Sequence, residues 1–75
     1  MVTSAQIRMA RAALQWTVRE LAERSGVHRN TITRLETRGT GNGPTMAAIR
    51  RALESAGVEF TNGDQPGVRL RKGHG

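Results

Sequence analysis

Apolar residues recur three or four positions apart along most of the chain, which is the spacing of one helical face. Ile7, Ala10 and Leu14 follow this spacing near the N-terminus, and Ile49 and Leu53 follow it further along. Two shorter stretches between them, residues 17–25 and 28–37 on either side of Gly26, repeat the pattern. The spacing predicts helices over residues 4–14, 17–25, 28–37 and 44–56.

Signals for helix ends agree with this spacing. The segments 3–6 and 17–20 each begin with Thr and end with Gln or Glu, as a capping box does. Gly26, Gly39 and Gly57 stand where the predicted helices end, and glycine readily takes the left-handed conformation found there.

The period changes after the fourth predicted helix, from helical to alternating. Four apolar residues alternate there with polar ones: Val58, Phe60, Val68 and Leu70. The stretch between them is rich in turn formers. It predicts either a short β-hairpin within one chain or two strands that a second subunit completes. We expect these four side chains to serve dimerisation, because an isolated hairpin is only marginally stable.

Because the chain has 75 residues, we expect it to form one small domain. A chain of this size buries only about 60% of its unfolded surface, so support from a partner subunit is expected. The predicted fold class is mainly α, with four helices over 1–57, a β segment over 58–72 and a frayed tail over 73–75.

The positive net charge of the chain favours a polyanion as its binding partner. Twelve Lys and Arg residues against six Asp and Glu give a formal net charge of +6, and all the basic residues but Lys72 are arginine. Arginine binds phosphate and guanine through two parallel hydrogen bonds. One Phe, one Trp and no Tyr argue against single-strand or RNA binding by base stacking.

Other classes of function have little support in the composition. There is no cysteine, and His74 in the tail is the only histidine besides His28, so neither a metal nor another cofactor is expected. No apolar run is long enough for a membrane span and no signal peptide is apparent, so we expect a soluble, cytoplasmic protein. Because no nucleophile–base set and no phosphate-binding loop occurs, we expect no enzyme.

The predicted third helix has two different faces when its residues are placed about 100° apart. Ile32 and Leu35 point inward. The outward half holds side chains that can read base edges: Arg29, Asn30, Thr33, Arg34 and Thr37. The alternative is a merely solvated polar face. Glu and Lys, the usual solvating residues, are absent from 29–35, which weighs against that alternative.

The segment around this helix carries a recognisable pattern. A Leu21-Ala22 pair leads through a Ser25-Gly26-Val27 turn to Thr31-Ile32, and a Leu35-Glu36 pair closes before a glycine. This pattern resembles the phage-repressor/Cro-type (XRE) helix-turn-helix family, over about residues 7–53. The resemblance implies a lambda-repressor-like four-helix domain that binds double-stranded DNA through its third helix. It also implies a protein that is encoded by a bacterium or a phage and is associated with the nucleoid.

The resemblance also implies roles for single residues. Base-reading side chains would be Arg29, Asn30, Thr33 and Arg34. Phosphate contacts would come from Thr17 and His28 at helix starts, and we expect Thr37 and Arg38 to add others; for His28, a helix-start role without DNA contact is the alternative. Arg11 and Glu36 would form an ion pair between helices one and three. Val18 departs from the family, where glutamine commonly anchors a phosphate.

These observations favour a sequence-specific transcriptional regulator, expected to be a repressor that binds an inverted repeat as a homodimer. The alternative is an antitoxin-like or accessory module whose C-terminal strands bind a protein partner. Nonspecific DNA architecture is a third hypothesis and predicts equal affinity for unrelated duplexes. A role at a membrane surface is not expected, because the fourth predicted helix has no aromatic anchor.

Overall fold

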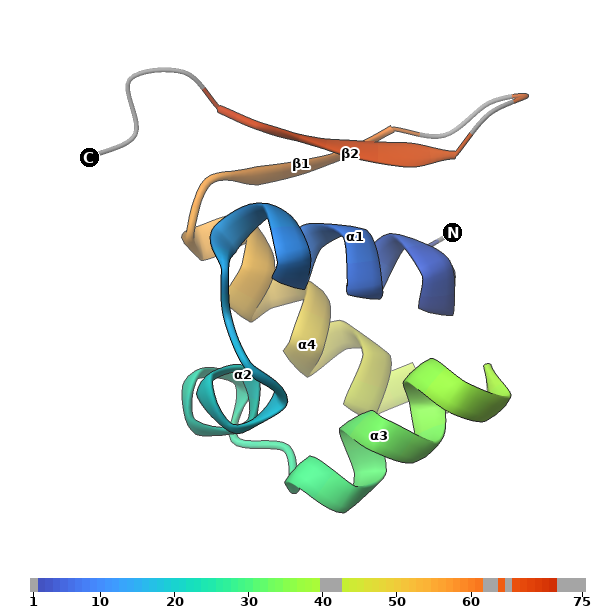
Figure 1. Cartoon of the computed structure of the whole chain (residues 1–75), viewed down its shortest axis with the longest axis vertical. Helices are drawn as coiled ribbons and strands as arrows, with labels where there is room; N and C mark the ends of the chain where they lie inside the picture. Colours follow the sequence, from blue (N-terminus) through green and yellow to red (C-terminus); the bar gives the residue numbers. More distant parts are fainter. Residues whose placement is uncertain (1, 40–42, 62–63, 65, 72–75) are drawn as a thin grey trace.

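The computed structural model describes residues 2–39, 43–61, 64 and 66–71. The predicted loop at 40–42, parts of the turn between the strands and the predicted tail at 73–75 lie outside the described residues. Four helices precede two strands (Figure 1): α1 Ser4–Leu14, α2 Val18–Ser25, α3 Arg29–Arg38, α4 Gly43–Ser55, β1 Val58–Thr61 and β2 Gly67–Leu70.

The strands form a hairpin within the chain, which decides between the two options that alternation left open. β1 pairs antiparallel with β2, and Phe60 stands opposite Val68. The mainly helical class with a C-terminal hairpin is therefore confirmed. Helices α2 and α3 begin one residue later than predicted, because Thr17 and His28 have extended backbone conformations and act as caps.

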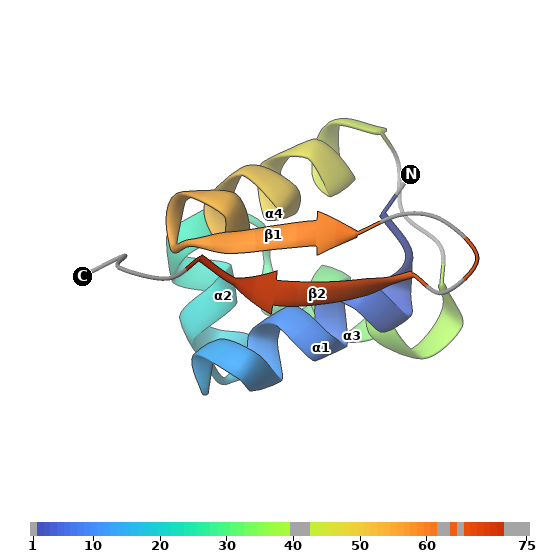
Figure 2. The ribbon, with the colours of Figure 1, turned by 90° about the horizontal axis from the view of Figure 1, so that it is seen from above.

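The hairpin and α3 lie at opposite ends of the molecule (Figure 1). Seen from above, β1 lies over α4 and β2 over α1, and these pairs are in contact (Figure 2). The hairpin thus covers one side of α1 and α4, and leaves α2 and α3 free on the other side.

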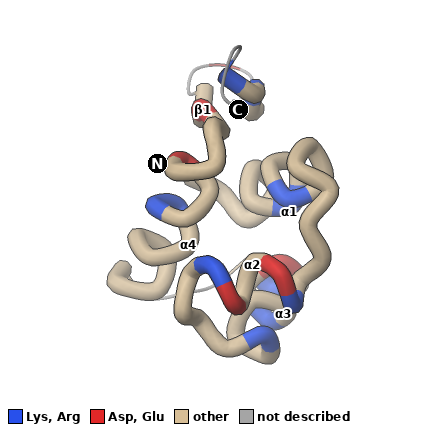
Figure 3. Tube along the Cα trace, turned by 90° about the vertical axis from the view of Figure 1, so that its left-hand side faces the viewer, with Lys and Arg blue, Asp and Glu red and all other residues tan. Residues whose placement is uncertain are grey.

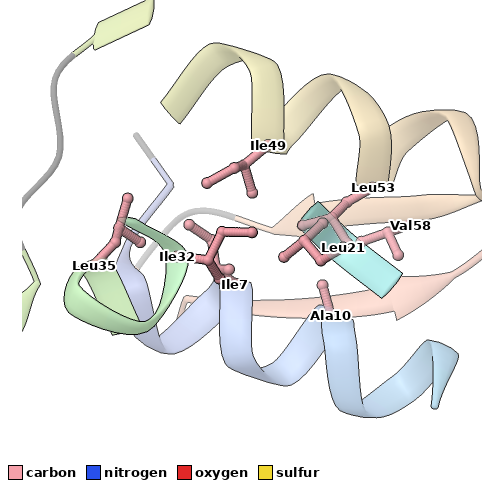
Figure 4. Packing of buried hydrophobic residues seen from close by; sticks show 8 residues of the cluster. All are labelled: Ile7, Ala10, Leu21, Ile32, Leu35, Ile49, Leu53 and Val58. Carbon is pink, nitrogen blue, oxygen red and sulfur yellow. The ribbon is translucent and has the colours of Figure 1, made fainter. Parts of the chain in front are cut away.

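Eight buried side chains form the core (Figure 4), and each is at most 1% exposed. They come from all four helices and from β1: Ile7, Ala10, Leu21, Ile32, Leu35, Ile49, Leu53 and Val58. Burying one such side chain is worth about 1.5–3 kcal/mol, so the helix pattern seen in the sequence is also the main source of stability.

Caps define where the helices begin and end. At the start of α1, Thr3 and Gln6 form the complete capping box that the sequence predicted. At the start of α2, the Thr17 hydroxyl accepts a hydrogen bond from the Glu20 N–H at 3.1 Å. Gly26 and Gly39 close α2 and α3 with φ of 76° and 74°, conformations that only glycine adopts at little cost.

Gln6 has a second task that joins the two ends of the chain. Its side chain is fully buried, and its Nε2 donates to the carbonyl oxygens of Thr61 at 2.9 Å and Gly67 at 3.0 Å. Its Oε1 accepts from the Thr3 N–H at 2.8 Å. One amide therefore fixes the start of α1 to both strands beside the hairpin turn.

Candidate nucleic-acid interface

The turn between α2 and α3 determines how α3 is presented. Gly26 ends α2 by donating its N–H to the Ala22 carbonyl oxygen at 3.0 Å. The Ser25 hydroxyl then accepts from the Val27 N–H at 3.2 Å, and Val27 packs against the core. Two helices joined by such a short glycine-containing turn constitute a helix-turn-helix unit, in which the second helix is the one that enters the DNA major groove.

Helix α3 has the two faces that the helical wheel predicted. Ile32 and Leu35 are buried in the core. The polar side chains of the other face are all exposed: Arg29, Asn30, Thr33, Arg34, Thr37 and Arg38. The last five of these line a shallow hollow of about 350 Å³ on the molecular surface. The predicted base-reading residues are thus brought together on one accessible helix face.

None of the arginines of α3 takes part in an ion pair within the described chain, whereas α2, α4 and the hairpin each contain at least one paired arginine. On α2, α4 and the hairpin, arginines pair with Glu20, Glu54 and Glu59. Within the described parts of the chain, Arg29, Arg34 and Arg38 take part in no ion pair. Figure 3 shows α2 and α3 together at the end of the molecule away from β1. The cations of α3 are therefore available to an external anion.

The side chains at the two helix starts are occupied as caps but remain exposed. His28 accepts the Asn30 N–H at its Nδ1, at 3.1 Å. Because that nitrogen accepts, the neutral ring carries its proton on Nε2, which is left as a free donor. Thr17 caps α2 in the same way through its hydroxyl. Both positions suit contact with a phosphate, since helix N-termini attract anions.

Val18, where the sequence departs from the family, has a structural role. It is half-buried at the first position of α2 and packs against the core. Its side chain therefore stabilises the domain and offers no polar group to a phosphate.

An arginine–glutamate pair joins α1 to α3, as the resemblance implied. Arg11 binds the Glu36 carboxylate twice, with Nε–Oε2 at 2.9 Å and Nη2–Oε1 at 3.0 Å. Its Nη1 also donates to the Trp16 carbonyl oxygen at 3.1 Å, just before α2. Since Glu36 is only 8% exposed, this pair fixes the end of α3 to the rest of the fold.

The predicted dimerisation residues lie in different environments. Val58 is 1% exposed and belongs to the core of its own chain, so its side chain presents no surface on the single chain. Alternation along a strand cannot separate a core face from a subunit interface. Phe60 and Val68 are half-buried, and Leu70 is 48% exposed.

Among the contacts that sequence reasoning missed, three tie residues of α1 or α2 to other parts of the fold. Arg8 on α1 donates to the backbone carbonyl oxygen of Glu36. Arg24 lies over the Trp16 ring, 4.8 Å from its centre. The third is the pair of bonds from Gln6 to the hairpin. All three join residues on different elements or in a linker, and periodicity within one helix contains no signal for them.

Other kinds of site have no basis in the described residues. They contain no group of three or more His, Cys, Asp or Glu side chains placed to hold a metal ion. None of the helices they form is both long and apolar enough to cross a membrane.

Comparison with known proteins agrees with this geometry. A family model described as a helix-turn-helix domain matches residues 4–60, which spans all four helices and most of β1. None of the curated proteins compared matches the chain. The match includes the turn, the exposed face of α3 and the Arg11–Glu36 pair, and the chain belongs to the helix-turn-helix domain family.

Proposed function

We propose that this protein is a sequence-specific regulator of transcription that binds double-stranded DNA through α3. The observation that carries the proposal is the exposed face of α3, where arginines without ion-pair partners in the described chain flank Asn30 and Thr33. On the other described elements that expose several arginines, acidic side chains neutralise some or all of them. Arg19 on α2 and Arg51 on α4 are also unpaired in the described chain, but each shares its helix with a paired arginine, whereas α3 has three unpaired arginines and no paired one.

In the proposed complex, α3 lies in the major groove. Arg29 and Arg34 suit guanine O6 and N7, Asn30 suits adenine N6 and N7, and the Thr33 methyl group suits the thymine methyl group. The remaining contacts would be to phosphates, and they set the orientation without reading sequence. They come from Thr17, His28, Thr37 and Arg38.

We further propose a homodimer on an inverted repeat, in which bound protein represses by excluding polymerase. Two recognition helices would then be about 34 Å apart. The molecule measures 31 × 29 × 19 Å, so two copies side by side give a spacing of this order. Leu70 and Met9 are the exposed large apolar side chains among the described residues, at 48% and 42%, and we assign them to the subunit contact with Phe60 and Val68.

A second candidate function is an antitoxin-like or accessory module. Each strand of the two-stranded sheet pairs only with the other within the described chain, so each has an outer edge that could accept a strand from a different protein. The molecular mass in solution discriminates between the two candidate functions. A stable homodimer of the isolated chain supports the first one. A monomer that forms a complex only with a different protein supports the second.

The test is selection of bound sequences from a random duplex library, followed by Arg34→Ala on the best site. We expect an inverted repeat, and a loss of about 1–3 kcal/mol in binding free energy with relaxed preference at one base position. Arg50→Ala is the matched control, because Arg50 is exposed on α4 and paired with Glu54. If Arg34→Ala weakened binding to all duplexes equally, the base-reading role would be refuted.

A further inference from the structure

Arg8 is bound to the recognition helix at a backbone atom. Its Nη1 donates to the carbonyl oxygen of Glu36, in the last turn of α3. The last four carbonyl groups of a helix have no partner within that helix. The Gly39 N–H satisfies the Leu35 carbonyl at 2.8 Å, and Arg8 satisfies the next one. A guanidinium here also complements the negative end of the helix dipole.

Arg11 holds the same residue by its carboxylate, so Glu36 is fixed to α1 through both its backbone and its side chain. Arg8 and Arg11 are three residues apart and lie on one side of α1. Arg34 precedes Glu36 by two positions, well within one turn. A tilt of the end of α3 would therefore displace the Arg34 side chain relative to a base edge.

We propose that Arg8 is a positioning residue for α3, which sets base specificity through the helix and does not contact DNA. The inference rests on the proposed DNA binding by α3. Both arginines are exposed, but Arg8 donates to the backbone carbonyl oxygen of Glu36, whereas Arg38 has no ion pair in the described chain and lies on the outward face of α3. Arg38 is thus the arginine suited to a phosphate. Substitution of Arg8 should therefore change base specificity, and substitution of Arg38 should change the salt dependence of binding.

The experiment compares Arg8→Ala with Arg38→Ala on the selected site and on an unrelated duplex, over a range of salt concentrations. For Arg8→Ala we expect the specific-to-nonspecific affinity ratio to fall by about fivefold, the lower end of what one bidentate base contact contributes, with an unchanged salt slope. For Arg38→Ala we expect an unchanged ratio and a salt slope smaller by about one. Arg50→Ala should change neither quantity.

A salt slope reduced by about one in Arg8→Ala, with the ratio unchanged, would overturn the inference and make Arg8 a phosphate contact. No change in either quantity would overturn it as well. Arg8→Lys can still donate one hydrogen bond to the Glu36 carbonyl oxygen, so it should restore part of the ratio lost in Arg8→Ala, again with an unchanged salt slope. If the wild-type chain showed no preference among duplexes, the proposed function would fail; a specific wild type with an insensitive Arg8 defeats only this inference.

Discussion

At the scale of single residues, Gln6 shows how one amide can serve two structures. As the third residue of a capping box it bonds to Thr3, which the Thr-x-x-Gln spacing predicted. Its bonds to Thr61 and Gly67 could not be predicted, because these residues lie 55 and 61 positions away and offer only backbone carbonyls, which every residue has. The inward and outward faces of α3, by contrast, follow from periodicity alone.

Gln6→Glu tests this double role. A carboxylate has no N–H to donate, so the Thr61 and Gly67 carbonyls lose their partner and meet a negative charge in a buried site. We expect the free energy of unfolding to fall by about 1–3 kcal/mol, measured by urea denaturation at neutral pH. Ala47→Glu adds a negative charge at an exposed position on α4 and should cost no more than about 0.5 kcal/mol. Equal losses in the two variants would contradict the role of the buried amide.

At the scale of elements, the two arginines of the hairpin share one glutamate. Glu59 on β1 binds Arg69 on β2 at 2.6 Å and Arg71 at 3.4 Å. The hydrogen bond and charge of Arg69, with a smaller effect of Arg71, lower the pKa of the Glu59 carboxyl below its ordinary value. Alternation predicted these strands, but it describes an intramolecular hairpin and an intersubunit pair equally well, so only the structure decides between them.

The lowered pKa of Glu59 predicts an acid-sensitive hairpin. The folded state favours the carboxylate, so the stabilisation is complete above the ordinary glutamate pKa and is lost as the pH falls through the lowered one. We expect Glu59→Gln to melt below the wild type at neutral pH, with a difference in Tm that shrinks on acidification. Glu23→Gln is the control, since Glu23 is exposed and forms no ion pair in the described chain. A difference in Tm for Glu59→Gln that is independent of pH would exclude the ion pairs as its cause.

At the scale of the whole molecule, the two ends have different electrostatic character. The hairpin end balances arginines with Glu59, whereas the α3 end keeps the cations of Arg29, Arg34 and Arg38 free of ion pairs within the described chain. The net charge of +6 predicted a polyanion partner but not where it binds. That location depends on which arginines find carboxylates after folding, and the fold supplies this information.

The dimer proposal predicts that Leu70→Lys yields a monomer. A charge placed on this exposed apolar side chain would have to be desolvated at the subunit contact. We expect analytical ultracentrifugation to give the mass of one chain, and binding to an inverted repeat to lose its cooperativity while half-site preference remains. Ala47→Lys, which adds the same charge at an exposed position on α4, should leave the dimer intact. A Leu70→Lys variant of dimeric mass would place the contact elsewhere.

The bonds between Gln6 and the hairpin also have a consequence for biosynthesis. Gln6 leaves the ribosome before Gly67, one of its two hairpin partners, which follows it by 61 positions. Until the hairpin has been translated, Nε2 of Gln6 lacks both of its carbonyl partners, and the side of the core beneath Val58 stays open to water. Both the buried amide and this side of the core are therefore completed only after β2 has left the ribosome, however early the helices form.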